Sequence, residues 1–457
     1  FLSLEQEGDD TLIRFDQDGS EGDEKSAIIV AVLEDVQANE LIADNFNPNF
    51  PPDGSAAESK TIKGTYLSDT LVGGFGDDTI SGLEGNDTID GQAGSDKIYG
   101  GEGNDVIEGN FGNDDLYGES GDDTITDDSG SNILDGGSGN DNLSSRSLSG
   151  NHTLIGSYGN DSLTATGKEV TLDGGDENDN LYAYGYIDKE GSRSYLEEGE
   201  ATVTGGAGDD YIRVEYYETV NVEGGEGRDS FRLRYLQGDV KVNAGAGNDR
   251  FGYEWDTGLY DVQGDVEVDL GDGDDGVYAS NGLNVDIDGG ADDDVLSIDD
   301  FLNGELSGGT GNDSLTATFR SNIWGVNRAR DKNENNIYDA TQVYVLDGGE
   351  GDDTLKIRGD YTRLENGANE ANLKGGKGND TIDITDNNAG STSNSNGNQY
   401  GIVKAVIDGG EGQDTITVSG GLDISITTGA DSDTVVLTAH QFRTLKEGPR
   451  IVKNDDG

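Results

Sequence analysis

Residues 64–144 read in nine consecutive frames of nine residues, and this periodicity constrains the fold more than any other feature of the chain. In order, the frames are GTYLSDTLV, GGFGDDTIS, GLEGNDTID, GQAGSDKIY, GGEGNDVIE, GNFGNDDLY, GESGDDTIT, DDSGSNILD and GGSGNDNLS. Nearly every frame has Gly at its first and fourth places, Asp at its sixth, and Ile or Leu at its eighth. A flexible linker would not keep an apolar residue at every ninth position, so the repeat predicts a solenoid.

Each frame combines a turn with a very short strand. The first six places are turn chemistry, because Gly adopts backbone angles that other residues reach only at a cost. The last three places form a minimal strand with one apolar side chain pointing inward. Such a unit cannot bury its apolar residue alone, so the frames must stack in register. We expect the eighth-place residues to form one continuous core: Ile80, Ile89, Ile98, Ile107, Leu116, Ile125 and Leu143.

The same stacking sets the sixth-place aspartates in columns, roughly 4.8 Å apart from coil to coil. Like charges at this spacing repel one another unless a cation lies between them. Carboxylate and backbone carbonyl oxygens are hard ligands, which suit Ca²⁺ better than a soft transition metal. The candidate metal ligands in the frames are therefore Asp78, Asp87, Asp96, Asp105, Asp114, Asp123 and Asp141.

The frame resembles the G-G-x-G-x-D-x-U-x nonapeptide of the RTX (repeats-in-toxin) family, in which U is a large apolar residue. The resemblance implies a parallel β-roll with each calcium ion held between the turns of successive coils. It also implies export by type I secretion through a C-terminal signal. We therefore predict an all-β fold: a parallel β-roll or β-solenoid with Ca²⁺ in its turns, plus a small N-terminal β module.

Composition limits the classes of partner. The 457 residues include 94 acidic and 29 basic ones, for a net charge of −65, which argues against nucleic acid or an anionic membrane as partner. No apolar run is long enough to span a bilayer. Large apolar residues are sparse, so folding is expected to depend on Ca²⁺. Cysteine is absent, which removes disulfides and thiolate chemistry. These properties suit the extracellular side of a bacterial cell, where calcium is millimolar.

The first 63 residues carry no nonapeptide. Strands are predicted at 1–4, 11–15 and 27–33. Residues 1–47 are predicted to form a small β module, which is similar to one that often lies near the end of type I secreted proteins; a plain β-meander that caps the roll is the alternative. Residues 48–63 are predicted to be a linker. Because the chain begins with Phe1 and contains no Met, we expect it to be a segment of a longer protein.

The repeat becomes sparser after residue 144. A Gly-rich hexad recurs at 156, 174, 205, 224, 244, 270, 289, 308, 348, 375, 409 and 428, at many intervals of 18 to 20 residues. Residues 145–436 are therefore predicted to continue the solenoid with one calcium turn per coil, and 437–457 to be a cap or the start of a further module. The hexads add these candidate metal ligands: Asp161, Asp179, Asp210, Asp229, Asp249, Asp275, Asp294, Asp313, Asp353, Asp380, Asp414 and Asp433.

Longer intervals between hexads predict loops on the opposite edge of the solenoid. The expected loops are 182–199, 254–264, 320–341, 359–371 and 386–401. Tyrosines in the first loop, Tyr182, Tyr184, Tyr186 and Tyr195, could stack on sugars or contact a neighbouring subunit, or they could simply cover the flank of the solenoid.

The third of these loops carries a second metal signal. Asp331, Asn333, Asn335 and Asp339 resemble the D-x-[DN]-x-[DN]-G calcium loop. Asn336 stands where that loop has Gly, and Gln342 stands where it has its bidentate Glu. A weak calcium site and a plain polar loop therefore both stay open.

No catalytic constellation was found, so we predict that the chain is not an enzyme. His152 and His440 have neither metal-ligand spacing nor a nucleophile partner, and both are expected at the surface. The predicted role is a secreted calcium-binding structural protein of the bacterial cell surface: a surface-layer, sheath or matrix-fibre subunit. Its expected partners are further copies of itself, in a fibre or lattice, and cell-surface polysaccharide. The alternatives are an RTX adhesin segment whose loops bind glycans or surfaces, and a secretion and folding tail of an exported enzyme.

Overall fold

The computed structural model describes residues 2–7, 10–16, 27–33, 58–189, 192–195, 199–253, 256–320, 342–360, 369–386, 402–420, 423–429, 431–438 and 450–451. Every regular element in these ranges is a β-strand. The chain divides into two compact units, 1–167 and 168–457.

The first unit contains a small sheet and a roll. Its strands are β1 (Leu2–Glu7), β2 (Asp10–Asp16), β3 (Ala27–Leu33), β4 (Thr61–Lys63), β5 (Thr70–Gly74), β6 (Thr79–Glu84), β7 (Thr88–Gln92), β8 (Lys97–Glu102), β9 (Val106–Glu108), β10 (Asp115–Ser120), β11 (Thr124–Asp127), β12 (Ile133–Ser138), β13 (Asn142–Arg146), β14 (Asn151–Tyr158) and β15 (Ser162–Thr166). Strands β1, β2 and β3 form an antiparallel sheet in that order. Their residue ranges nearly match those of the three strands predicted for the N-terminal module.

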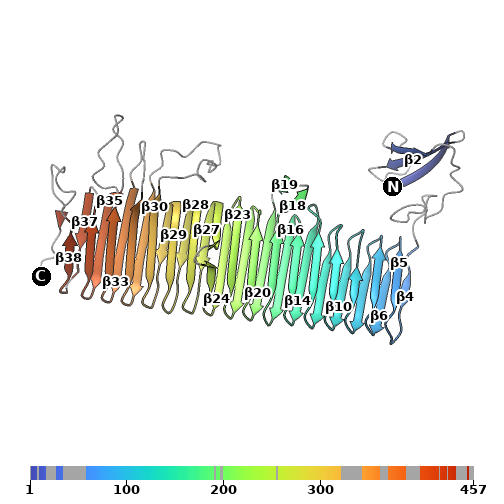
Figure 1. Ribbon diagram of the computed structural model, residues 1–457, viewed down its shortest axis with the longest axis horizontal. Coiled ribbons are helices and arrows are strands. Elements are labelled where there is room, and N and C mark those ends of the chain that lie inside the picture. The colour runs from blue at the N-terminus through green and yellow to red at the C-terminus, as the bar shows by residue number, and fades with distance from the viewer. Residues whose placement is uncertain are drawn as a thin grey trace. The chain divides into compact units, whose positions relative to one another are not determined.

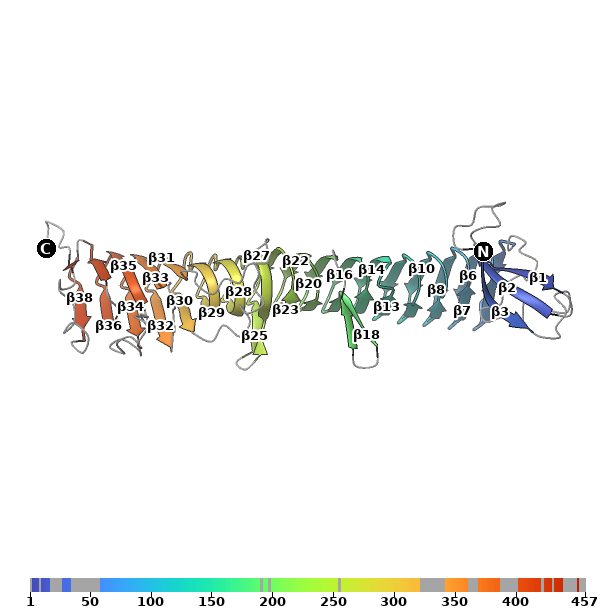
Figure 2. The ribbon, with the colours of Figure 1, turned by 90° about the horizontal axis from the view of Figure 1, so that it is seen from above.

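The roll consists of two layers of parallel strands. One layer contains β4, β6, β8, β10, β12 and β14, and the other contains β5, β7, β9, β11, β13 and β15. Figure 2, seen from above, separates β6, β8 and β10 from β7 and β13. Equivalent residues pair across coils 18 residues apart, so that Ile80 pairs with Ile98 and Ile98 with Leu116. One coil therefore contains two frames.

The core runs between the two layers. All seven of the predicted eighth-place residues are fully buried. The apolar side chains of each layer point toward the other layer. Two frames together can therefore bury apolar side chains that a single frame would leave exposed. This confirms the predicted parallel β-roll and its continuous core.

The roll begins earlier than predicted. Strand β4 pairs with β6 in the same parallel register, and Ile62 lies opposite Ile80. The predicted linker at 48–63 therefore overlaps the first strand of the roll, because Thr61–Lys63 carries the same strand pattern without the Gly-rich turn before it.

The second unit has the same two-layer construction. Its strands are β16 (Glu169–Asp176), β17 (Asn180–Tyr184), β18 (Tyr186–Lys189), β19 (Ser192–Tyr195), β20 (Glu200–Ala207), β21 (Tyr211–Glu215), β22 (Thr219–Glu226), β23 (Ser230–Leu236), β24 (Val240–Ala246), β25 (Arg250–Tyr253), β26 (Asp256–Thr257), β27 (Leu259–Asp269), β28 (Gly276–Asp288), β29 (Val295–Ser307), β30 (Ser314–Arg320), β31 (Val343–Glu350), β32 (Thr354–Asp360), β33 (Asn369–Lys377), β34 (Thr381–Asp386), β35 (Ile402–Glu411), β36 (Thr415–Ser419), β37 (Asp423–Thr427), β38 (Thr434–Leu437) and β39 (Arg450–Ile451). Strands β31, β33 and β35 lie in one layer, and β32, β34 and β36 lie in the other (Figure 2).

Two predicted loops are largely strand. Tyr182 and Tyr184 lie in β17, so the insertion within 182–199 is the antiparallel hairpin of β18 and β19 (Figure 1). Within 254–264, Leu259 and Val262 belong to β27 and are buried, because they pair with Leu233 and Leu236 and continue the core. Both predictions placed the boundary of the insertion too far into the solenoid.

The other predicted insertions fall mainly on residues outside the described ranges. The candidate calcium loop with Asp331, Asn333, Asn335 and Asp339 is among them. Gln342 is described, and it is buried: its Nε2 donates a hydrogen bond to the carbonyl of Phe301 at 2.9 Å.

Most of the predicted C-terminal segment, 437–457, also lies outside the described residues, including His440. Strand β39 pairs in parallel with β37, with Ile451 opposite Ile426. The coil-to-coil pairing of the solenoid therefore extends into the segment that was predicted to be a cap.

The expectation of a surface position for His152 is wrong. Its side chain is 2% exposed and fills the space between two glycines, Gly150 and Gly167. Nδ1 lies 2.8 Å from Ser145 Oγ, and Nε2 lies 3.2 Å from the Ser147 carbonyl. Burial lowers the pKa of His152, so the ring belongs to a neutral internal network.

We predict that Ile107→Ala destabilises the calcium-loaded protein by about 2–5 kcal/mol, because it leaves a cavity in a continuous core. The neighbouring Val106, 41% exposed in the same strand, provides the control. Val106→Ala should change the free energy of unfolding by no more than about 0.5 kcal/mol. Urea unfolding followed by circular dichroism in excess Ca²⁺ measures both values, and equal effects would contradict the inward and outward assignment.

Candidate calcium sites

The Gly-rich turns lie on defined edges of each unit. In the first unit, alternate frames lie on opposite edges. One edge, which we call the first edge, carries Asp69, Asp87, Asp105, Asp123, Asp141 and Asp161. The second edge carries Asp78, Asp96 and Asp114, followed by Asn132. In the second unit one edge carries all the hexad aspartates: Asp179, Asp210, Asp229, Asp249, Asp275, Asp294, Asp313, Asp353, Asp380, Asp414 and Asp433.

One oxygen of each sixth-place carboxylate holds two coils together. The backbone N–H of Asp87 donates to Asp105 Oδ1 at 2.7 Å, and that of Asp105 donates to Asp123 Oδ1 at 2.7 Å. The second edge repeats this bond at Asp78, Asp96 and Asp114. In the second unit, the ladder runs without a break from Asp179 to Asp433.

The other oxygen, Oδ2, is buried and accepts no hydrogen bond. This holds for the described aspartates at the sixth place of a frame or hexad from 78 to 414: Asp78, Asp87, Asp96, Asp105, Asp114, Asp123, Asp141, Asp161, Asp179, Asp210, Asp229, Asp249, Asp275, Asp294, Asp313, Asp353, Asp380 and Asp414. An anionic oxygen out of reach of water and of any donor is costly, so a cation is the natural partner for it.

The first-place glycine leaves room for that cation. A Cβ on Gly73 would lie 2.6 Å from Asp78 Oδ2 and 2.6 Å from the carbonyl oxygen of Gly91, which belongs to the next coil. On Gly91 it would lie 2.5 Å from Asp96 Oδ2 and 3.0 Å from the Gly109 carbonyl oxygen. Each turn thus brings a carboxylate oxygen and a carbonyl oxygen together beside a Cα that bears no side chain. These hard oxygen donors fit Ca²⁺.

The fourth-place glycine serves a different purpose. Gly103 has φ +130°, and a Cβ there would lie 2.6 Å from the carbonyl carbon of Gly85 in the coil below. Gly is therefore required both for the backbone angle and for the close stacking of turns.

Burial has a direct electrostatic effect on these carboxylates. It raises the pKa of Asp96 and Asp229 to about 7 and that of Asp294 to about 8, although the coil-to-coil hydrogen bond from the preceding backbone N–H opposes the rise. Neighbouring aspartates of the same column raise it further. A divalent cation would reverse both effects, since it favours the ionised form.

Two ends of the columns differ from the rest. Asp69 Oδ2 accepts hydrogen bonds from Thr65 N at 2.6 Å and Thr65 Oγ1 at 2.8 Å, so this carboxylate is satisfied locally. Asp433 is only half-buried, and its Oδ1 accepts the N–H of Asp414 at 3.0 Å. In the described ranges no three His, Cys, Asp or Glu side chains gather to hold a metal ion. The repeated turns instead supply carboxylates one at a time, together with backbone oxygens.

Sequence reasoning missed Asp127. It is buried beside Asp114, and burial, followed by the contact with Asp114, raises the pKa of its carboxyl to about 9. The signal that could have identified it is an aspartate at the first place of a frame, where the pattern requires Gly.

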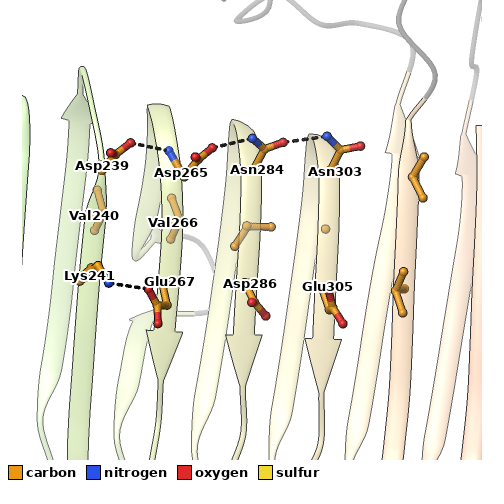
Figure 3. Close-up of a pocket in the computed structure, with 14 residues that line it drawn as sticks. Asp239, Val240, Lys241, Asp265, Val266, Glu267, Asn284, Asp286, Asn303 and Glu305 are labelled. Atoms are coloured by element: carbon orange, nitrogen blue, oxygen red, sulfur yellow. Dashed lines mark hydrogen bonds and ion pairs between the residues drawn. The ribbon is translucent and has the colours of Figure 1, made fainter.

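A groove of about 530 Å³ lies on the outer face of β24, β27, β28, β29 and β31 (Figure 3). A row of acid and amide groups borders it: Asp239 Oδ1 accepts the N–H of Asp265, and Asn284 Nδ2 donates to Asp265 Oδ1 at 2.5 Å. Lys241 forms an ion pair with Glu267 at 2.8 Å. The groove offers hydrogen-bonding groups, and none of its lining residues is aromatic.

We predict that Asp105→Asn raises the calcium concentration at the folding midpoint by about an order of magnitude, because one anionic ligand is lost from the first edge. Glu108→Gln removes the same charge from an exposed position three residues away and should leave the midpoint nearly unchanged. Calcium titration followed by circular dichroism compares the two variants. Equal shifts would show that only net charge matters.

The raised pKa values also predict a pH dependence in chelator. In chelator the folded chain keeps protons on these buried carboxyl groups, whereas the unfolded chain releases them near the ordinary pKa of 3.8. The resulting stability is fully present below pH 4 and is lost as pH rises through about 6 for Asp105 and about 7 for Asp96. Thermal unfolding in chelator between pH 5 and 7.5 should therefore show a falling midpoint, whereas calcium affinity should rise over the same range. A midpoint in chelator that rises with pH would contradict the burial of these carboxylates.

Comparison with known proteins agrees with this geometry. A model of the RTX calcium-binding nonapeptide repeat matches residues 63–98, 81–116, 90–125, 108–143, 155–185, 198–214, 345–356 and 369–383. No curated protein and no solved structure matches the chain. Repeats of this family bind calcium and typically occur in extracellular proteins that leave the cell by type I secretion. The described residues include no helix that could cross a membrane. The matched parts of the chain are RTX calcium-binding nonapeptide repeats.

Proposed function

We propose that this calcium-binding repeat protein is a structural subunit of the bacterial cell surface, in a surface layer, sheath or matrix fibre. In this role Ca²⁺ drives both its folding and its assembly, and further copies of the same chain are its main partners. The role is mechanical rather than catalytic. The observation that carries the proposal is the incomplete burial of core positions in the first described coil of the first unit and in the last described strands of the second unit.

Among the described residues, the core of the first coil is only partly covered. Ile62 and Leu71 occupy core positions of this coil but are only half-buried, whereas Ile80 and Ile89 in the next coils are fully buried. A solenoid needs a cap at its end, supplied either by its own chain or by another copy.

An apolar patch marks the same end. Tyr66 is 72% exposed and Leu67 is 74% exposed, in the turn of the first coil. Exposed aromatic and aliphatic side chains of this size favour contact with another surface.

The last described coil shows the same feature. Val435 and Leu437 of β38 are half-buried, although Ile416 and Val418 of the preceding coil in that layer are fully buried. Contact between one end of a chain and the opposite end of the next is heterologous, and such contacts build open filaments.

Charge supplies the calcium dependence of assembly. At a net charge of −65, two copies repel each other strongly in chelator. Ions bound along the edges reduce that charge, so calcium promotes association as well as folding.

An adhesin that binds cell-surface polysaccharide is the second candidate. The acid and amide row of the groove in Figure 3 could bind sugar hydroxyls. However, the groove offers no aromatic ring for stacking, and Tyr182 and Tyr184 outside it stack on each other with ring centroids 6.4 Å apart. These observations favour the structural role.

We predict that the purified chain is monomeric in chelator and forms ordered filaments or sheets in several millimolar Ca²⁺. Light scattering and electron microscopy measure this assembly. The double variant Tyr66→Ser, Leu67→Ser should bind calcium and fold normally but lose assembly, because it removes the apolar patch at the open end.

Tyr158→Ser is the matched control, since Tyr158 is a 61% exposed tyrosine away from that end, and it should assemble normally. A wild-type chain that stays monomeric at every calcium concentration would overturn the structural role. In that case, binding to a glycan array would test the adhesin.

A further inference from the structure

The second edge of the first unit ends in a turn that departs from the repeat. Its frame, residues 127–135, reads DDSGSNILD, with Asp127 in place of the first Gly and Asn132 in place of the sixth-place Asp. This turn lies above the column formed by Asp78, Asp96 and Asp114, one coil beyond Asp114.

Asp127 points into the site below it. Its side chain is 2% exposed, and its Oδ1 accepts the N–H of Ser129 at 2.9 Å. Its Oδ2 accepts no hydrogen bond and is the nearest heavy atom to the place where a Cβ of Gly109 would lie. The second nearest is Asp114 Oδ2, 2.8 Å from that place.

A regular turn has a different pair of oxygens at this place. Beside Gly91, the carboxylate of Asp96 faces the carbonyl oxygen of Gly109. Beside Gly109, the carboxylate of Asp114 faces a second carboxylate. The oxygen nearest to this place is thus anionic in addition to that of Asp114, and both oxygens are buried without a donor.

Above Asp127, the groups are neutral and satisfied. Asn132 Oδ1 accepts the N–H of Asp114 at 3.0 Å, and its Nδ2 donates to the Ser129 carbonyl at 2.8 Å and to Ser145 Oγ at 3.3 Å. Ser145 in turn contacts His152. The column of carboxylates therefore stops at the pair of Asp114 and Asp127, and no donor from the next coil neutralises this pair.

We propose that Asp114 and Asp127 together hold a Ca²⁺ ion that is bound more tightly than the ions in the regular turns of the same unit. Two carboxylates neutralise the ion fully, and affinity for Ca²⁺ rises with the charge of the ligand set. This ion closes the second edge: it is retained when the others leave. The inference concerns calcium retention and does not depend on assembly.

The test uses the complete chain and Ca²⁺ alone. Chelators of graded affinity are added to the calcium-loaded protein, and the calcium retained is measured by mass spectrometry. Wild type should keep a class of ion at a free calcium concentration at least tenfold lower than the regular class. Asp127→Asn should lose this class, whereas Asp128→Asn, at the exposed neighbouring position, should keep it.

A second variant keeps the test decisive if Asn disturbs the turn. Asp127→Gly restores the repeat pattern, so it should fold at saturating calcium and convert the tight ion to the regular class. Retention of the tight class in both Asp127 variants would overturn the proposal. So would a wild type with a single affinity class, or an unchanged calcium profile combined with greater stability of Asp127→Asn in chelator. The last result would mean that the two carboxyl groups share a proton instead of an ion.

Discussion

One oxygen of each sixth-place carboxylate from Asp78 to Asp414 is buried without a hydrogen-bond donor. The rest of the structure depends on how the charge of that oxygen is neutralised. Oδ1 accepts a backbone N–H from the adjacent coil, which fixes the spacing of the coils. Oδ2 lies beside a glycine Cα and a carbonyl oxygen, where a bound cation offsets the cost of burying the ionised group. One side chain thus joins the backbone ladder and the ion column. We therefore expect calcium binding and folding to be coupled.

In the second unit, the two edges of the solenoid carry different features. In the second unit the hexad edge keeps the ladder from Asp179 to Asp433. The opposite edge carries the hairpin of β18 and β19 and the corners of β28 and β29, which pass from one layer to the other as single long strands. Separating these features lets one edge vary in sequence without loss of the metal ligands.

Sequence patterns predicted the roll well, because its requirements are local. Gly at the first and fourth places, Asp at the sixth and Ile or Leu at the eighth each answer to a contact that recurs in every coil. The failures concern residues whose environment is set by distant coils. Sequence alone places Leu259 and Val262 in a loop. Only their pairing with Leu233 and Leu236 shows that they belong to the core. No local sequence pattern marks His152 as a core residue. It is buried where the second edge departs from the repeat. Asp127 reads as a degenerate position, although its side chain points at Gly109 in the coil below.

In the second unit, the hydrogen bonds between hexad aspartates have similar lengths whatever the number of residues between them. The same bond, 2.8 Å long, joins Asp294 to Asp313 across 19 residues and Asp313 to Asp353 across 40 residues. Coils are thus matched by their turns and not by residue count, and the entropic cost of a longer connection grows only slowly with its length. The edge opposite the hexads is therefore a natural place for grafting. Foreign peptides inserted there would be presented one coil apart along this edge of the second unit.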